Sequence, residues 1–199
     1  MNKKNIKTIM SSLNECSLAL DNVINSPEIV SSISLASESI ISSLSSGSKL
    51  YACGNGGSMA DAMHLCEELS GRFRKDRRGL PAIAISDPCY LTCVANDFGY
   101  DQVFSRFLES NAKKDDLLFA ISTSGSSTNI LNAAKFAKIN NLKVISLTGK
   151  LNSKLSYESN IDICTPYGEF SDRVQELHIK IIHIIVELIE KSMFPENYN

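Results

Sequence analysis

The sequence predicts an α/β fold in which a five-stranded parallel sheet is buried between two layers of helices. Five short segments are apolar throughout, and helical stretches separate them. Strands of a parallel sheet are covered on both faces and therefore read as apolar runs. Loops rich in glycine and serine follow the first and third segments, at the strand ends where such sheets bind ligands. We therefore expect three layers, α/β/α, with additional helices at the N-terminus.

The first 46 residues predict two helices. Apolar residues recur at helical spacing along residues 6–24. Ser26, Pro27 and Glu28 then supply an N-cap, a first-turn proline and a first-turn acid for a second helix, which we expect to end near Gly47. The apolar stripe of each helix is too narrow for either to fold alone. We expect them to pack on the rest of the domain or on another subunit.

The five strands are expected at residues 49–53, 81–86, 116–122, 142–148 and 161–164. A helix is expected over 127–140, and a long final helix over 171–193 with Ser171 as its N-cap. Neither an internal repeat nor a linker interrupts the pattern. The chain therefore reads as one domain, 1–199, which includes a helical extension over 1–46.

The charge balance argues against a nucleic-acid-binding protein. The chain has 20 Lys and Arg against 22 Asp and Glu, a net charge of −2, whereas nucleic-acid-binding proteins carry a basic excess. The basic run at 72–78 reads as a solvated loop with Arg72 directed toward a ligand. No apolar run reaches the roughly 18–20 residues that cross a bilayer, and no signal peptide follows the basic N-terminus. We expect a cytoplasmic protein with neither nucleic-acid nor membrane partners.

The six cysteines predict free thiols. They are scattered, and no CxxC pair or dense disulfide framework is present. Four lie in apolar or helical stretches and are expected to be buried: Cys53, Cys66, Cys93 and Cys164. Buried free thiols are typical of a reducing compartment.

Residues 54–58 and 122–127 form two candidate ligand loops. The first, Gly-Asn-Gly-Gly-Ser, lets the backbone approach a ligand and opens a helix whose amides face an anion. It matches neither the GxGxxG nor the Walker A pattern, so nucleotide cofactors are not supported. The second offers four serines and a threonine as hydroxyl donors at a helix start. A polar turn with an ordinary N-cap explains either loop alone, but two at equivalent strand ends favour phosphate or sugar binding.

Titratable residues on two helices suit proton transfer or a metal ion. His64 and Glu68 are four residues apart and share one helix face, while Gln175 and His183 lie on the final helix. A carboxylate and histidines beside a phosphate loop are what proton transfer next to a carbonyl requires. These N and O donors also suit a divalent ion, zinc foremost. A lone helical histidine is more often structural, and His178 is assigned no role.

With these residues the chain resembles, over nearly its whole length, the phosphoheptose isomerase family of the sugar isomerase (SIS) fold. The resembling stretches are GNGGS at 54–58, DAMHLCEELSGRF at 61–73, AIAISD at 82–87, NDFGYDQVFSRF at 96–107, ISTSGSS at 121–127 and DRVQELHIKIIHIIVELIEK at 172–191. The histidine–glutamate helix, the serine loop and the final histidine helix are together specific within the fold. Met59, Ala60 and the pair Leu65-Cys66 depart from the family pattern, and none removes a functional group.

The resemblance implies a role for each matching residue. Glu68 and His183 would be catalytic. Substrate contacts would come from Asn55, Gly56, Gly57, Glu68, Arg72, Asn96, Asp97, Ser122, Thr123, Ser124, Ser127, Asp172 and Gln175. One zinc ion per subunit would be held by His64, Glu68, Gln175 and His183. Family members are homotetramers with sites completed across subunit interfaces, which would give the N-terminal helices a partner.

The implied reaction is aldose–ketose isomerisation of sedoheptulose 7-phosphate to D-glycero-D-manno-heptose 7-phosphate through an enediol. It is the first step toward nucleotide-activated heptose for lipopolysaccharide core, capsule or a related glycoconjugate. Two alternatives keep the fold without the chemistry. One is a regulatory protein that binds a sugar phosphate, and the other is a protein-binding module such as the branch that associates with the replication initiator. Neither needs Glu68 and His183, whose presence favours the enzyme.

Overall fold

Five parallel strands form the centre of the molecule. The computed structural model describes residues 2–168 and 170–198. The sheet has the order β2-β1-β3-β4-β5, and every neighbouring pair is parallel. The strands are β1 (Leu50–Cys53), β2 (Ala82–Ala84), β3 (Leu117–Ser122), β4 (Lys143–Thr148) and β5 (Ile161–Cys164). The order reverses between β1 and β3, and an open α/β sheet binds ligands at such a switch point.

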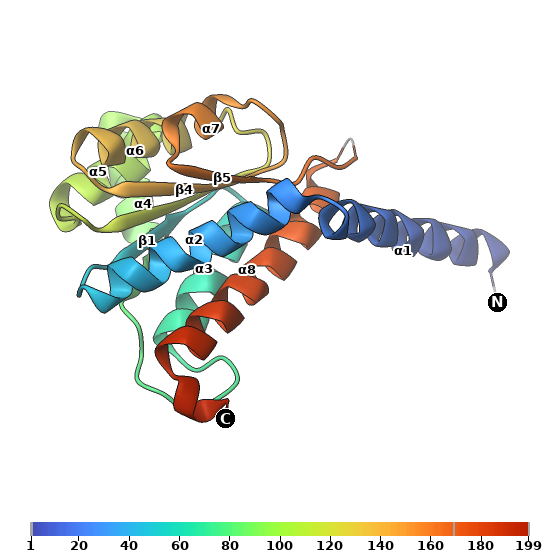
Figure 1. Ribbon diagram of the computed structural model, residues 1–199. Helices are drawn as coiled ribbons and strands as arrows, with labels where there is room; N and C mark the ends of the chain where they lie inside the picture. The colour runs from blue at the N-terminus through green and yellow to red at the C-terminus, as the bar shows by residue number, and fades with distance from the viewer. Residues whose placement is uncertain (1, 169, 199) are drawn as a thin grey trace.

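Helices cover both faces of the sheet, as expected for a parallel sheet (Figure 1). One face is packed by α2 (Pro27–Ser45), α3 (Gly57–Ser70) and α8 (Ser171–Met193). The other is packed by α4 (Pro88–Phe98), α5 (Val103–Asn111), α6 (Thr128–Ile139) and α7 (Lys154–Glu158). Two 3₁₀ turns, Tyr100–Gln102 and Pro195–Asn197, complete the described elements after the first helix, α1 (Lys3–Ile24). The expected three-layer α/β/α arrangement is confirmed.

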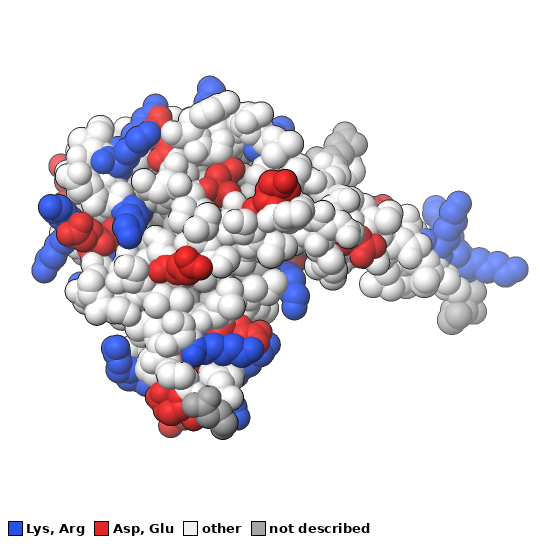
Figure 2. Space-filling view, viewed as in Figure 1, with Lys and Arg blue, Asp and Glu red and all other residues white. Residues whose placement is uncertain are grey.

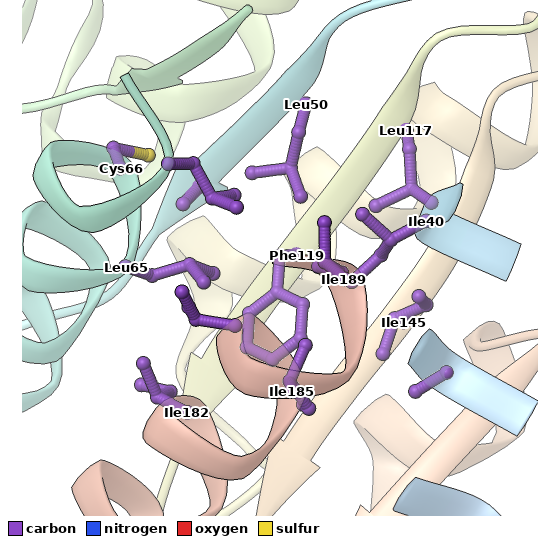
Figure 3. Close-up of a cluster of buried hydrophobic side chains, with 14 of the residues drawn as sticks. Ile40, Leu50, Leu65, Cys66, Leu117, Phe119, Ile145, Ile182, Ile185 and Ile189 are labelled. Atoms are coloured by element: carbon purple, nitrogen blue, oxygen red, sulfur yellow. The ribbon is translucent and has the colours of Figure 1, made fainter. Parts of the chain in front are cut away.

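The larger core lies between the sheet and the α2, α3 and α8 layer. Phe119 of β3 is fully buried at its centre. Figure 3 shows Ile182, Ile185 and Ile189 of α8 gathered around its ring, with Leu65 of α3 alongside. Burying side chains of this size stabilises the fold by about 1.5–3 kcal/mol each. The core therefore fixes α3 and α8 against the same strands, and these two helices carry the candidate site residues.

The first helix projects from this body (Figure 1). Asn2 caps α1 by accepting from the Lys4 amide, and Ser26 caps α2 by accepting from the Ile29 amide, as its sequence predicted. Large apolar side chains of α1 are exposed, among them Ile9, Met10, Leu13, Leu18 and Ile24. On the face in Figure 2, acidic and basic side chains are interspersed over the body. Within the described residues, no helix is both long and apolar enough for a bilayer span.

Strand and helix positions agree with the sequence prediction to within a few residues, but three local expectations were wrong. Ser171 is the first residue of α8, and Phe170 occupies the N-cap position without a side-chain cap. Cys93 is exposed, because it lies on the outer face of α4, and Cys164 is only partly buried, whereas Cys53 and Cys66 are buried as expected. The run at 72–78 is not wholly solvated, since the Arg77 side chain is 1% exposed and pairs with Glu190.

Candidate active site

A polar cavity of about 320 Å³ opens at the carboxyl ends of β1 and β3. The loops after these strands approach each other there, because the strands are neighbours at the switch point of the sheet. The start of α8 closes the third side. The cavity is lined by Asn55, Gly56, Gly57, Ser58, Ile121, Ser122, Thr123, Ser127, Ser171 and Gln175. Both loops predicted from the sequence therefore share one cavity.

Close packing around the glycine loop explains why it contains glycines. Gly56 has φ of 56°, a left-handed conformation that favours glycine. A Cβ on Gly57 would lie 2.5 Å from Oε1 of Gln175. The glycine therefore allows the Gln175 amide to reach the first turn of α3, where it lines the cavity.

Asn55 joins the two loops through its side chain. Asn55 Nδ2 donates to Asn129 Oδ1 at 2.9 Å, and Asn129 Nδ2 donates back to Asn55 Oδ1 at the same distance. The Tyr100 hydroxyl donates to the same oxygen at 3.0 Å. Sequence reasoning missed Asn129, although its place in the first turn of the helix after the serine loop was a usable signal. The pair holds the two loops in register around the cavity.

The serine loop presents several hydroxyls in a small space. Ser122 Oγ lies 3.4 Å from both Ser124 Oγ and Ser127 Oγ. Ser126 donates from its hydroxyl to Ser124 at 3.1 Å. These distances are long for O–H···O hydrogen bonds, so the hydroxyls form only weak hydrogen bonds with one another. They remain able to donate to a ligand oxygen.

Three helix N-termini face the cavity without a side-chain cap. The N-cap residues of α3, α6 and α8 are Gly56, Ser127 and Phe170, and none accepts a hydrogen bond from its own helix through its side chain. By contrast, α1, α2, α4 and α7 are capped by side chains. The first amides of a helix need acceptors, and the helix dipole favours an anion there. The start of α5 also lacks a side-chain cap but does not line the cavity. Residues from the starts of α3, α6 and α8 line one cavity, which is a strong arrangement for a phosphate group.

His64, Glu68 and His183 form a cluster further along α3 and α8. His64 Nε2 lies 3.2 Å from Glu68 Oε1 and 3.2 Å from His183 Nε2. The Glu68 side chain is 16% exposed and the His64 side chain 38%. Burial lowers the pKa of His183, nearby His64 lowers it further, and Glu68 opposes both effects. The sequence predicted these three residues as neighbours, and the fold brings them together.

The donor atoms of this cluster fit a divalent metal ion. One ligand atom from each of the three residues lies within 4.8 Å of the others. Tetrahedral zinc with nitrogen or oxygen ligands at about 2.0–2.1 Å separates neighbouring ligand atoms by roughly 3.3 Å, close to the distances above. Gln175, the fourth expected ligand, lies two helical turns before His183, and its amide packs against Gly57. Three of the four expected ligands therefore converge in this chain.

Five other predicted site residues lie outside the cavity lining. Ser124 is one of them, although its hydroxyl lies 3.4 Å from that of the lining residue Ser122. Asn96 and Asp97 are exposed near the end of α4 and hydrogen-bond to each other at 2.9 Å. Arg72 is exposed in the loop after α3, and the Asp172 side chain is 62% exposed at the start of α8. A single chain therefore assembles the loops and the cluster, and leaves the other four side chains open to solvent.

Comparison with known proteins places the chain in a family. Residues 17–149 match the SIS domain model. Phosphoheptose isomerase from Cytophaga hutchinsonii is 50% identical over 94% of this chain and 97% of its own length, and the one from Vibrio cholerae is 49% identical over 93% and 97%. The chain belongs to the phosphoheptose isomerase family. The structure of a phosphoheptose isomerase from Francisella tularensis superposes with a TM-score of 0.88 at 32% identity, and covers 96% of this chain and 100% of that one.

Membership in the phosphoheptose isomerase family confirms the resemblance seen in the sequence and the isomerase fold and class expected from it. The similarity spans the N-terminal helices as well as the sheet, because the alignments cover nearly the whole chain.

Proposed function

We propose that the protein isomerises sedoheptulose 7-phosphate to D-glycero-D-manno-heptose 7-phosphate through an enediol, the first step toward nucleotide-activated heptose. The observation that supports this most is the position of the polar cavity. It lies at the N-terminal ends of α3 and α8, the helices that together carry the His64–Glu68–His183 cluster. His64 follows Gly57 by seven residues and His183 follows Gln175 by eight, about 10 and 12 Å along each helix. An open-chain sugar phosphate held by its phosphate in the cavity extends along these helices toward the cluster.

In this mechanism the serine loop and the N-terminal ends of α3, α6 and α8 bind the phosphate. Glu68 removes the proton from C1 as general base, and the pair of electrons forms the C1–C2 double bond of the enediol. His183 moves protons between the oxygens on C1 and C2. Glu68 then returns its proton to C2, and the carbonyl group is left on C1. The lowered pKa of His183 keeps its ring neutral near pH 7, so the ring can both accept and donate.

Zinc is the ion that the donor set of His64, Glu68 and His183 fits best, with Gln175 as the proposed fourth ligand. When bound, it would polarise the oxygens at C1 and C2 and stabilise negative charge there. Glu68 and His183 would then each have two functions, in proton transfer and as metal ligands, and chelation of the metal tests whether the second is needed.

We further propose that the chain acts as one domain, 1–199, in a homotetramer with sites completed across subunits. The exposed apolar side chains of α1 support this, because Ile9, Met10 and Leu13 are each more than half exposed in the single chain. Asn96 and Asp97 would meet substrate at such an interface. The cytoplasm is the proposed location, supported by six cysteines that are all free thiols.

The test is turnover of sedoheptulose 7-phosphate by the purified protein, as isolated, after chelation, and after zinc is added back. Loss on chelation and recovery with zinc would support both the isomerase and the metal. Activity indifferent to chelator would keep the isomerase and remove the metal from it. Binding of the sugar phosphate without turnover in any state would contradict the proposal and favour the regulatory alternative.

A further inference from the structure

A fully buried ion pair lies beside the His64–Glu68–His183 cluster. Arg77 Nε donates to Glu190 Oε1 at 3.0 Å, and each of the two side chains is only 1% exposed. Removing two charges from water is costly, and a buried pair is often no more stabilising than apolar side chains of the same volume. Stability alone is therefore a poor explanation for this pair.

The other two nitrogens of the Arg77 guanidinium bind backbone carbonyl groups at the C-terminal end of α3. Arg77 Nη2 donates to the Glu68 carbonyl oxygen at 2.6 Å, and Nη1 donates to those of Leu69 and Gly71, both at 2.7 Å. The last carbonyls of a helix have no partner within it and carry its negative dipole end. The guanidinium therefore closes the helix at the turn that bears Glu68. Its five donors in a planar fork suit this geometry, which the single ammonium of lysine cannot reproduce.

Glu190 connects Arg77, and with it the end of α3, to α8. It lies seven residues after His183, which is two helical turns along the same helix. Its second oxygen accepts from the Tyr198 hydroxyl at 2.6 Å and from the Arg74 amide at 3.4 Å. One carboxylate therefore ties the end of α3, the loop after it and the chain terminus to the helix that bears His183.

The loop held in this way places an aromatic ring on His183. Phe73 stacks on the imidazole with 5.9 Å between ring centres and 29° between planes. The Arg74 guanidinium also lies over the Phe73 ring, 5.0 Å from the ring centre, and pairs with Glu187 at 2.9 Å. Phe73 therefore supports the His183 ring, and the hydrogen bond from the Arg74 amide to Glu190 holds this part of the loop in place.

We propose that Arg77 and Glu190 form a clamp that sets the position of Glu68 relative to His183. This inference rests on the proposed function, because it assigns the two as positioning residues for the proton transfers. Neither side chain lines the cavity, and Arg77 hydrogen-bonds to Glu68 only at its backbone carbonyl oxygen. Apolar packing holds α3 and α8 together but allows small shifts, whereas directional bonds to three carbonyls do not. A displacement of about 1 Å in a reacting group lowers rates by about a hundredfold.

The experiment compares Arg77→Lys and the double variant Arg77→Met/Glu190→Met with Arg78→Met. The double variant removes both buried charges, so it is expected to stay folded. Arg78 is the control, because it is the next residue in the same loop and its exposed side chain, which lies over the Phe194 ring, takes no part in the clamp. For sedoheptulose 7-phosphate, kcat is expected to fall at least tenfold in both Arg77 variants with KM within threefold. Arg78→Met should keep kcat within twofold.

A folded double variant with the kcat of the wild type would overturn the clamp and leave the pair a structural feature. If the double variant does not fold, Arg77→Lys decides, since it keeps the charge and loses only the fork. If the wild type itself shows no turnover, the proposed function fails, and amide hydrogen exchange over residues 66–72 then tests the clamp by itself. Exchange there should be at least tenfold faster in Arg77→Lys than in Arg78→Met, and equal rates would overturn the inference.

Discussion

We expect the burial of His178 to lower the free energy of unfolding of this protein at acidic pH. Its ring is completely buried on α8, and Nε2 lies 3.3 Å from the Thr148 carbonyl oxygen, to which it donates. Nδ1 is also buried and has no hydrogen-bond partner among the described residues. Burial lowers the pKa of His178 to about 4 from its ordinary 6.5, and the hydrogen bond to Thr148 opposes this shift. The folded protein therefore favours the neutral ring.

The size of the effect follows from the two pKa values. A drop from 6.5 to about 4 corresponds to about 3 kcal/mol of unfolding free energy. Because the folded pKa is the lower one, this contribution is complete above pH 6.5 and is lost as the pH falls toward 4. Between pH 7.5 and 4.5 the loss is about 2.5 kcal/mol.

His178→Gln tests this directly, because the glutamine amide can donate to the Thr148 carbonyl and does not titrate. Urea unfolding of both proteins is measured at equal protomer concentration from pH 7.5 to 4.5, so that subunit association affects both alike. All other titratable groups are shared and cancel in the difference between the two proteins. The variant should gain about 2.5 kcal/mol relative to the wild type over this range. A difference that stays constant with pH would refute the reasoning.

Three further predictions concern the site. Glu68→Gln and His183→Gln should each lower kcat at least about a hundredfold while the protein stays folded, and near-normal turnover in either would remove that residue from the mechanism. Gly57→Ala should fold but raise KM at least tenfold, because the new methyl group displaces the Gln175 amide from the cavity; a KM within twofold of the wild type would show that this amide is not needed there. Burial raises the pKa of Asp61 to about 6, and His64 opposes this shift. The free energy of unfolding of the metal-free protein should therefore decrease as the pH rises from about 4 to 6 and the buried carboxyl group ionises. Asp61→Asn should therefore stabilise the metal-free protein by about 1–3 kcal/mol at pH 7.5 and not below pH 4, by urea unfolding; an equal gain at both pH values would contradict this account.

The sequence alone determined the elements and much of the site chemistry. Strand positions followed from apolar runs, and the start of α2 followed from Ser26 and Pro27, because such signals depend on residues a few positions apart. The neighbouring positions of His64 and Glu68 followed in the same way from helical spacing. The prediction for Cys93 failed because an apolar segment on a surface helix still has one outward face.

Only the tertiary structure decided which distant residues meet. The pairing of Asn55 with Asn129 depends on β1 and β3 being neighbours in the sheet, and that order is not written in either loop. The burial of Arg77 against Glu190 joins residues 113 positions apart, and no local pattern separates that arginine from the solvated ones beside it. The convergence of three uncapped helix starts on one cavity is likewise set by how the layers pack. Local spacing fixes what a segment can form, whereas its partners are fixed by the packing of the whole chain.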